Sequence, residues 1–587
     1  MCGIAGYLGK RKASPILLDA VRRLEYRGYD SVGIATLHEQ RLSVRKAVGN
    51  VEEVDKKLHF AEMPGNVGIA HTRWATTGKV TDENAHPHLS NNGKIAVVHN
   101  GIIENYQELK GFLQKNGYTL KSQTDTEVIP NLIEHHMKRK SLKQAFLETL
   151  RQLEGTFSIV ALDEGSGTIL GARHNSPLVL GLARDGTYIA SDVSPFIEAT
   201  KKAVLLEDDE AVILDNKLEI LNFRTGKPVR KKIFLMHWNY EQAKKGDYEH
   251  FMMKEIDEQG STIKKAVQQD AKLMKKAVSM VKKAFGVFLV GCGTSYHACV
   301  SASYVFSHIA KKHVNVVLAS EFENHREFLT NKTLLIALSQ SGETADVLEA
   351  VRIAKDKGVK IIAITNVVSS TLTQLADETI MMNCGPEICV LSTKSYTAQL
   401  AILTALVYGL AGKLEAGKKL VLQAAAKVPD IIRDSTPKIK ALASKIKDSR
   451  SIFLIGRDMA YPSALEGALK IKEVSYIHAE GFAGGELKHG TIALIEDNVP
   501  VIVLATEHTK KEILANAMEV KARGGYIIGI NSRQDDVYDY FIEVPEAGMA
   551  NPILMIIPIQ ILAYYLAIER NLDPDKPRNL AKSVTVK

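Results

Sequence analysis

Val287-Phe288-Leu289-Val290-Gly291 is an unbroken apolar run that ends in glycine, and Ile452-Phe453-Leu454-Ile455-Gly456 repeats it. Apolar runs that alternate with helical stretches are typical of parallel strands covered on both faces. The second half of the chain is therefore predicted to be a duplicated α/β unit with two doubly wound parallel sheets, whose ligand sites lie at the carboxyl ends of the strands. Two further pairs recur in the same order: residues 334–338 with 501–504, and 361–364 with 527–530.

The N-terminal part, up to about residue 238, has short strands closed by Gly, Asn and Asp turns, with helical stretches at about 105–116 and 125–138. This pattern predicts a layered α/β unit. It begins at Cys2, which carries both a thiol and a free α-amine once Met1 is removed. Because the reference pKa values of about 8.5 and about 7.7–8.0 are close, the amine can take the thiol proton. The apolar residues 4–9 predict a strand that holds Cys2 in place; an incidental cysteine at a frayed end is the alternative.

Length and composition describe a soluble multidomain protein. The 587 residues suffice for roughly three or four domains. A net charge of +8 mildly favours an anionic small molecule, but the lysines are spread along the chain, so nucleic acid is not predicted. Five cysteines are few and odd in number, which indicates a reducing compartment and a cytoplasmic protein. Cys384 and Cys389 have no histidine nearby, so no metal site is predicted.

Neither a signal peptide nor a membrane span is predicted. Lys10, Arg11 and Lys12 follow the N-terminus too closely for the apolar core of a signal peptide. The most apolar run, residues 553–568, is interrupted by Pro558 and is shorter than a spanning helix needs. It is predicted to be a buried core helix.

Four polar clusters punctuate the N-terminal part, at residues 22–30, 71–78, 99–101 and 124–127. Each has an ordinary explanation by itself, because an Asn-Gly pair at a strand end is usually a turn and an Asp before a helix is usually a cap. Together with a terminal cysteine they fit amide chemistry. A thiolate that attacks a carboxamide makes an oxyanion, which an Asn side chain and a Gly N–H can stabilise. Arg and Asp suit the carboxylate and ammonium groups of an amino-acid substrate.

Five motifs of this segment resemble the N-terminal-nucleophile glutamine amidotransferase domain: Cys2-Gly3-Ile4, Arg27-Gly28, His71-Thr72-Arg73-Trp74, Asn100-Gly101 and Thr124-Asp125. The resemblance implies that Cys2 attacks the amide of glutamine and that Asn100 and Gly101 form the oxyanion hole. It further implies that Arg73 holds the carboxylate of glutamine and Asp125 its amine, while Trp74 gates the ammonia path. Thr76 is a further residue implied in glutamine binding. Relatives often read Thr-His-Gly where this chain has Thr76-Thr77-Gly78, which affects only a loop contact.

Polar residues also gather where the predicted strands of the first copy end. Gly291-Cys292-Gly293-Thr294-Ser295 has Tyr296 where a dinucleotide loop would have its third glycine, so NAD is not predicted. Ser339-Gln340-Ser341-Gly342-Glu343-Thr344 opens the predicted helix 345–357. Capping needs one hydroxyl, whereas this loop has three and an amide. The surplus of donors favours phosphate binding over capping alone.

The second copy lacks these loops, because residues 457–460 and 505–507 have other sequences. It offers Glu466, Lys470 and Glu473 instead, at a spacing that places them on one helix face. A solvated salt-bridge face and a catalytic set both fit this spacing.

The second half closely resembles the paired sugar-isomerase domains of the glutamine:fructose-6-phosphate aminotransferases. The resemblance rests on residues 291–296, 339–344, 392–394, 466–473, 486–490 and the tail 577–586. It implies that glutamine is hydrolysed to glutamate and ammonia. The ammonia is then channelled to fructose 6-phosphate, which is aminated and isomerised to glucosamine 6-phosphate, the first step toward UDP-GlcNAc.

The same resemblance implies a role for each site residue. Lys582 forms a Schiff base with the C2 ketone, Glu473 moves a proton between C1 and C2, and His489 opens the sugar ring from a neighbouring subunit. Glu466 and Lys470 set the electrostatics. The implied partners are the two substrates and a second copy in a homodimer or larger homo-oligomer, without cofactor or metal. The residues implied for the phosphate are Ser295, Ser339, Gln340, Ser341 and Thr344, and those for the sugar are Thr294, Val390 and Ser392.

Two other classes of function were weighed: a phosphosugar sensor and a hydrolysing deglycase. A sensor has no use for Cys2 or Lys582 and normally carries a DNA-binding helix pair, which the sequence does not show. The predicted limits are 1–238 for the amidotransferase domain, 239–250 for a linker, 251–430 and 431–575 for the two sugar-isomerase domains, and 576–587 for a tail that acts as a lid.

Overall fold

The computed structural model describes residues 2–215, 217–235, 245–368 and 370–585. The chain divides into two compact units, Met1–Glu241 with Ala581–Lys587, and Gln242–Leu580. The predicted end of the first domain at residue 238, and residues 239–244 of the predicted linker, lie outside the described residues.

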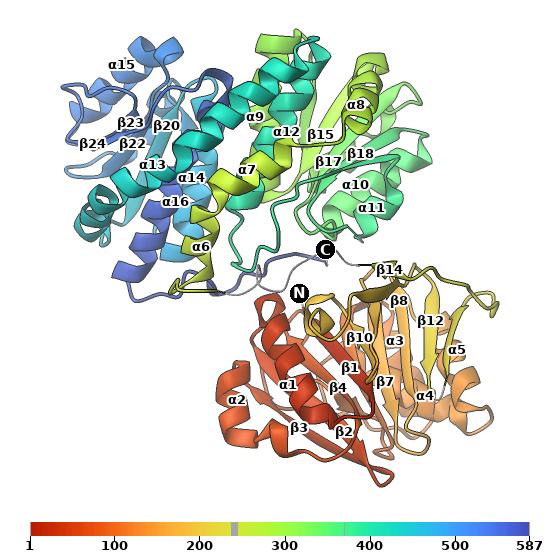
Figure 1. Cartoon of the computed structure of the whole chain (residues 1–587). Helices are drawn as coiled ribbons and strands as arrows, with labels where there is room; N and C mark the ends of the chain where they lie inside the picture. The colour runs from red at the N-terminus through yellow and green to blue at the C-terminus, as the bar shows by residue number, and fades with distance from the viewer. Residues whose placement is uncertain (1, 216, 236–244, 369, 586–587) are drawn as a thin grey trace. The chain divides into compact units, whose positions relative to one another are not determined.

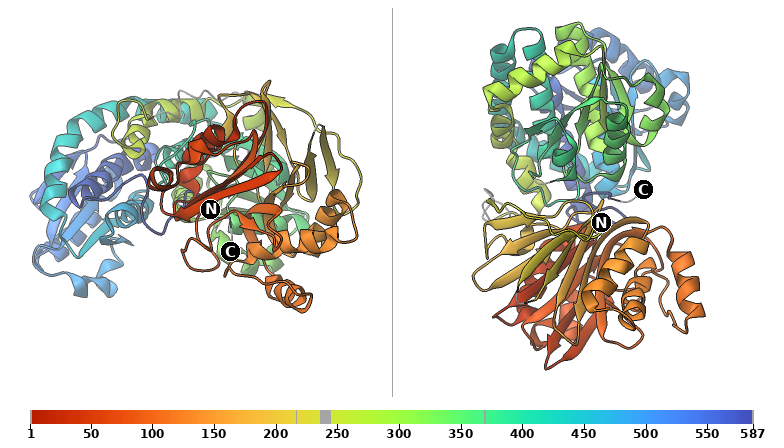
Figure 2. Two further views of the ribbon diagram at one scale, coloured as in Figure 1. Left: turned by 90° about the horizontal axis from the view of Figure 1, so that it is seen from below. Right: turned by 90° about the vertical axis from the view of Figure 1, so that its right-hand side faces the viewer.

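Two antiparallel sheets form the centre of the first unit (Figures 1 and 2). Their side chains alternate, so Ile4 packs between the two sheets, whereas Ala5 and Tyr7 pack against the helices outside. The first sheet has the order β14-β11-β9-β10-β1-β4-β2-β3. Its strands are β1 Gly3–Gly9, β2 Ser31–His38, β3 Arg41–Val48, β4 Val67–Arg73, β9 Val179–Leu182, β10 Gly186–Ala190, β11 Lys202–Leu205 and β14 Phe234–Leu235.

The second sheet of this unit has the order β13-β12-β8-β7-β6-β5. Helices cover the outer face of each sheet, which makes four layers and confirms the predicted layered α/β class. The strands are β5 His88–Leu89, β6 Ile95–Ile103, β7 Gly155–Asp163, β8 Ile169–His174, β12 Glu210–Leu214 and β13 Leu218–Asn222. The helices are α1 Ala13–Leu24 and α2 Val51–Leu58 on the first sheet, and α3 Tyr106–Lys115, α4 Val128–Met137 and α5 Leu142–Gln152 on the second.

The Asn100-Gly101 pair does not end its strand, contrary to the sequence-based expectation. β6 continues to Ile103, and Gly101 pairs with Phe157 of β7. Gly101 has φ +129°, and a Cβ there would collide with the carbonyl of Thr156. Pairing with β7 overrides the turn preference of Asn-Gly, so the glycine serves a close approach of two backbones.

The second unit contains two five-stranded parallel sheets with the same strand order, β16-β15-β17-β18-β19 and β21-β20-β22-β23-β24. This confirms the duplication predicted from the repeated apolar runs. The first sheet has β15 Gly286–Gly291, β16 Asn315–Leu318, β17 Thr333–Leu338, β18 Lys360–Thr365 and β19 Glu378–Met381. The second has β20 Ser451–Gly456, β21 His478–Ala483, β22 Pro500–Leu504, β23 Tyr526–Asn531 and β24 Tyr540–Glu543.

Helices cover both faces of each parallel sheet (Figure 1). Leu289 faces a core that runs between the two copies, whereas Phe288 faces a separate core on the other side of its sheet. This is why the strands are apolar at every position. The helices are α6 Phe251–Asp257, α7 Gln259–Val267, α8 Ala271–Lys283, α9 Gly293–Val305, α10 Ala345–Asp356, α11 Thr371–Leu375, α12 Lys394–Leu410, α13 Leu414–Ile446, α14 Ala460–Ser475, α15 Lys510–Lys521 and α16 Asn551–Glu569.

Two helices bear on the sequence-based predictions. The helical segment Gly548–Glu569 is long and apolar enough to cross a membrane, but 89% of its most apolar window is buried inside the protein, as expected for a core helix. The predicted boundary between residues 430 and 431 falls inside α13, a single helix of 33 residues. The domain limits therefore remain predictions.

Candidate active sites

Cys2 lies at the start of β1, between the neighbouring strands β4 and β10. The backbone N–H of Trp74 donates to its Sγ at 3.3 Å, and the thiol faces the carbonyl of Trp74 at 3.4 Å. The carbonyl of Cys2 accepts from Asn100 Nδ2 at 2.9 Å and from Arg27 Nε at 3.3 Å. Burial raises the pKa of the Cys2 thiol, while the Trp74 hydrogen bond and Arg73 act in the opposite direction. The structure thus brings together Cys2, Arg27, Trp74 and Asn100.

Gly28 allows the chain before β2 to approach this site closely. A Cβ at Gly28 would lie 2.7 Å from the backbone of Arg73 and Trp74. Arg27 is held next to it by an ion pair with Asp192 at 3.2 Å. Any side chain at position 28 would push away the segment that hydrogen bonds to Cys2.

The expected anchors for glutamine are already engaged with the protein backbone. Arg73 donates to the carbonyls of Thr77, Gly78 and Lys79, the shortest contact being 2.6 Å to Thr77. Asp125 accepts from the N–H of Ile103 at 2.7 Å. Thr76, in the loop after β4, is exposed. These contacts fix the backbone around Cys2 and leave the assigned roles of Arg73, Asp125 and Thr76 as proposals.

Four buried histidines lie behind Asn100, and only two of them fall in the polar clusters seen in the sequence. His71 Nε2 is 3.1 Å from Asn100 Oδ1 and 3.0 Å from the carbonyl of His99. Both partners are acceptors, so His71 carries its proton on Nε2. His86 and His99 both contact Thr126 Oγ1, and His88 contacts Thr124.

The histidine cluster is uncharged at neutral pH. Burial lowers the pKa of His71 to about 3 and lowers the pKa values of His86, His88 and His99 as well. A neutral His71 that donates to Asn100 Oδ1 turns the amide so that Nδ2 faces Cys2. Sequence reasoning missed this function of His71, because β4 and β6 belong to different sheets and only the packing of the two sheets places it beside Asn100.

Replacing His71 by alanine should lower glutamine hydrolysis about 10- to 100-fold, because the oxyanion donor Asn100 loses its orientation. The KM for glutamine should change little. His71→Gln, whose amide can donate to the same oxygen, should retain more activity, and His38→Ala on the surface is the matched control. Equal rates for His71→Ala and wild type in a glutaminase assay would contradict this role.

In the second unit, Ser339–Thr344 forms a tight loop between β17 and α10, as predicted. Ser339 Oγ accepts from the N–H of Gly342 at 3.0 Å and contacts Thr344 Oγ1 at 2.9 Å. Gly342 has φ +66°, and a Cβ there would collide with Ser370, so only glycine fits this turn. Glu343 accepts from the N–H and hydroxyl of Thr371 at 2.7 and 2.8 Å, which fastens the loop to α11.

Thr294 and Ser295 begin α9 at the carboxyl end of the neighbouring strand β15. Ser295 Oγ accepts from Gln399 Nε2 at 3.0 Å. Thr294 donates to Glu466 Oε1 at 3.0 Å and accepts from Lys470 Nζ at 3.0 Å. The two copies of the α/β unit therefore meet at Thr294, a residue predicted to line the sugar.

Glu466, Lys470 and Glu473 share one face of α14, where Glu466 and Lys470 are buried and Glu473 is half-buried. Glu466 is 0% exposed and Lys470 1%. Lys470 Nζ lies 2.7 Å from Glu473 Oε2 and 3.4 Å from Glu466 Oε1. Burial opposes the charge of Lys470, but Glu466 and Glu473 outweigh it and raise the pKa of Lys470. His297, which sequence reasoning missed, contacts Glu466 at 2.8 Å.

The remaining predicted residues belong to other segments of the chain. His489 lines a cavity of about 620 Å³ with Arg457 and Lys488, among residues different from those around Glu466. Val390 is buried and Ser392 half-buried in the segment before α12, Gln340 and Ser341 are half-buried, and Lys582 is half-buried near the C-terminus.

Family comparisons agree with this division of the chain. Residues 71–198 match the glutamine amidotransferase domain, and residues 280–408 and 445–570 each match the SIS domain. The fold and its sites thus define an amidotransferase joined to a pair of sugar-isomerase domains.

Curated relatives align over the whole chain. The chain is 45% identical over 597 residues to a glutamine–fructose-6-phosphate aminotransferase (isomerizing) of Pyrococcus horikoshii and 44% identical over 602 residues to one of Thermococcus kodakarensis, each covering 100% of both chains. The C-terminal domain of glucosamine-fructose-6-phosphate aminotransferase from Francisella tularensis matches with a TM-score of 0.51 and 33% identity, over 57% of this chain and 99% of that one. The chain belongs to the glutamine–fructose-6-phosphate aminotransferase (isomerizing) family.

Proposed function

We propose that the chain makes glucosamine 6-phosphate and glutamate from fructose 6-phosphate and glutamine. The full-length likeness to the aminotransferases supports this activity. The structural observation that supports this activity most directly is the buried cluster of Glu466, Lys470 and Thr294. It places a carboxylate, an amine and a hydroxyl group in contact with one another at the carboxyl end of a parallel sheet. A protein that only binds phosphosugars has no need of a lysine held charged in the core.

Glutamine hydrolysis takes place in the first unit. The Cys2 thiolate attacks the carboxamide carbon, and the oxyanion is stabilised by Asn100 Nδ2 and the N–H of Gly101. Asn100 Nδ2 donates to the carbonyl of Cys2 in this structure, so it already faces the nucleophile. Ammonia leaves, and water converts the thioester of Cys2 to glutamate. Arg73 and Asp125 bind the two charged groups of the substrate.

Amination and isomerisation use side chains of the second unit together with Lys582 of the C-terminal tail. Ser295, Ser339, Gln340, Ser341 and Thr344 hold the phosphate. His489 moves the proton that opens the ring, and Lys582 forms an imine with the C2 ketone, releasing water. Ammonia displaces Lys582 and leaves an imine at C2. Glu473 then moves a proton from C1 to C2 while the C1 hydroxyl loses its proton and becomes the aldehyde, so that one water is released overall. Lys470 Nζ lies 2.7 Å from Glu473 Oε2 and so places a positive charge beside this proton acceptor.

The proposal extends to the ammonia and to the assembly. Ammonia passes from Cys2 to the sugar without release to solvent, gated by Trp74, because ammonium formed in water is not a nucleophile. The tail 576–587 acts as a lid, and the protein is a cytoplasmic homodimer or larger homo-oligomer.

A nitrogen-labelling experiment tests both the reaction and the transfer. The wild-type protein is incubated with fructose 6-phosphate, amide-15N glutamine and an excess of unlabelled ammonium, and the product is analysed by mass spectrometry. We expect hexosamine phosphate that carries mostly 15N. Without glutamine, or without the sugar phosphate, the labelled product should be absent. A product that carries the isotope ratio of the medium would disprove the transfer, and no product at all would disprove the function.

A further inference from the structure

The segment between β19 and α12 carries Val390 and Ser392 but has no regular secondary structure. Its backbone is held by acceptors from distant parts of the chain. Glu255 Oε1 of α6 accepts from the N–H of Ile388 at 2.5 Å and of Cys389 at 3.4 Å. The carbonyl of Asp575 accepts from the N–H of Val390 at 3.2 Å. We call this segment, residues 382–393, the sugar loop. Three consecutive N–H groups of the sugar loop therefore donate to acceptors in α6 or in the C-terminal segment.

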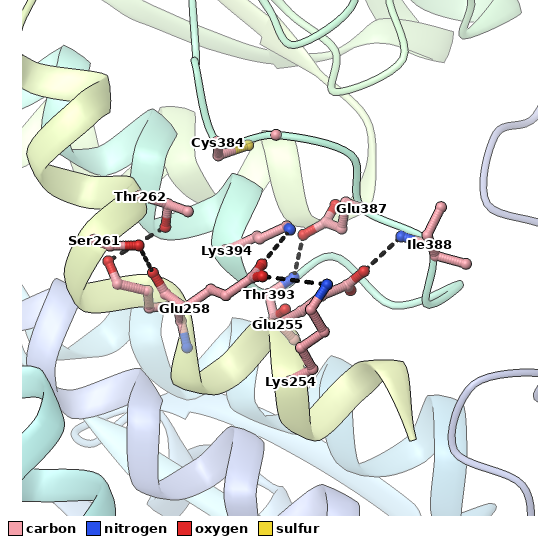
Figure 3. Close-up of polar contacts among 12 residues, drawn as sticks. Lys254, Glu255, Glu258, Ser261, Thr262, Cys384, Glu387, Ile388, Thr393 and Lys394 are labelled. Carbon is pink, nitrogen blue, oxygen red and sulfur yellow. Dashed lines mark hydrogen bonds and ion pairs between the residues drawn. The ribbon is translucent and has the colours of Figure 1, made fainter. Parts of the chain in front are cut away.

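Figure 3 shows the α6 side and the α12 side of the sugar loop. Glu387 accepts from the N–H groups of Thr393 and Ser395, both at 3.0 Å, and so closes the loop onto the start of α12. Lys394, 1% exposed, donates to Glu258 at 2.6 Å. Burial opposes the charge of Lys394, but Glu255 and Glu258 raise its pKa, so it remains a cation that ties α12 to the helices carrying those carboxylates.

Asp575 joins this loop to α6. Its two carboxylate oxygens accept from the first two N–H groups of α6, Phe251 and Met252, each at 2.7 Å. These N–H groups have no partner within a helix, so a carboxylate there satisfies both. The same residue thus caps α6 with its side chain and holds Val390 with its carbonyl.

The segment that contains Asp575 also reaches α14. The N–H of Arg578 donates to the hydroxyl of Tyr476 at 2.7 Å, and its guanidinium lies 4.2 Å from the centre of the Tyr476 ring. Tyr476 directly follows α14, the helix that carries Glu466, Lys470 and Glu473. Residues 575–578 therefore connect the sugar loop, α6 and the helix with the buried charges.

We infer that Asp575 is a positioning residue for fructose 6-phosphate. The carboxylate of Asp575 caps α6, which fixes the position of Asp575 itself and of Glu255 in α6. The carbonyl of Asp575 and the carboxylate of Glu255 then hold the backbone around Val390 in place against the sugar. The Asp575 carboxylate also fixes the start of the segment that leads to Lys582. Without the carboxylate, the loop and this segment must be ordered when the sugar binds, which weakens binding. This inference rests on the proposed function of the second unit.

Asp575→Asn tests it, because one oxygen that accepts from a backbone N–H becomes an NH2 group that faces that donor. We expect the KM for fructose 6-phosphate to rise about tenfold, as the loss of one charged hydrogen bond would produce. Glutamine hydrolysis without the sugar should stay as in wild type. Asp573→Asn is the matched control: it makes the same change of charge two residues away and keeps the oxygen that accepts from the N–H of Asp575.

Asp575→Glu keeps both acceptor oxygens and should recover part of the affinity. Should Asp575→Asn fail to fold, Glu255→Ala removes the other acceptor of the loop and should raise the same KM. A KM within twofold of wild type in these variants would overturn the inference, and so would a parallel loss of glutamine hydrolysis and sugar affinity. If wild-type protein makes no hexosamine phosphate, the proposed function itself fails, whatever the variants do.

Discussion

Replacing Cys2 by alanine should abolish the synthesis of glucosamine 6-phosphate from glutamine, with a loss of at least about 1,000-fold, as expected when a covalent nucleophile is removed. The position of Cys2 explains the size of the effect. The backbone N–H of Trp74 donates to the Cys2 thiol, and Asn100 Nδ2 donates to the carbonyl of Cys2. Within the residues that the structure describes, no other thiol lies among these groups.

Ammonium salts provide the control for this variant. Cys2→Ala should still form product from fructose 6-phosphate and ammonium, because the second unit is unchanged. Cys292→Ala is a further control for glutamine hydrolysis, since burial raises the pKa of the Cys292 thiol to about 12 and it lies in the second unit. Hexosamine phosphate is measured with each nitrogen source. Glutamine-dependent synthesis by Cys2→Ala would show that the nucleophile lies elsewhere.

Replacing Lys470 by methionine should remove sugar amination and also destabilise the second unit by about 3–5 kcal/mol, the usual cost when one partner of a buried ion pair is lost. Glu466 has no exposed surface, so its charge loses its compensating cation. Thr294 loses the Lys470 hydrogen bond at the same time. Glu473 loses its ion-pair partner as well.

The measurement compares Lys470→Met with Lys472→Met, two residues along the same helix and exposed. The chemical change is identical, but Lys472→Met should change neither the activity nor the free energy of unfolding measured by urea denaturation. Glutamine hydrolysis should survive in both variants. Normal conversion of fructose 6-phosphate and ammonium by Lys470→Met would show that the buried cluster has no part in the reaction.

Much of the fold could be read from local patterns. The repeated apolar runs predicted β15 and β20 with their parallel sheets, and the loop Ser339–Thr344 lies at the strand end where the pattern placed it. Residues 4–9 form β1, and residues 553–568 lie within the buried helix α16. Such predictions succeed because burial on both faces and helix spacing act over a few neighbouring residues.

Asn100-Gly101 shows where local patterns fail. The pair has the composition of a turn, yet it continues β6 because β7 pairs with it along its length. His86 and His88 carried no sequence signal at all, since a lone buried histidine looks like any other. His86 contacts Thr126 and His88 contacts Thr124 only because the segment before α4 folds against β5 and β6.

The sequence by itself determined the fold class, the duplication and the residue types at the strand ends. The tertiary structure alone decided which of those residues meet. Thr294 contacts Glu466 and Lys470 of the other copy, and the N–H of Val390 donates to the carbonyl of Asp575, which lies far along the chain near the C-terminal end of the unit. Local preferences act between residues a few positions apart. These contacts instead join residues that are distant in the sequence, so they form only when the two copies pack together and bury the charged groups.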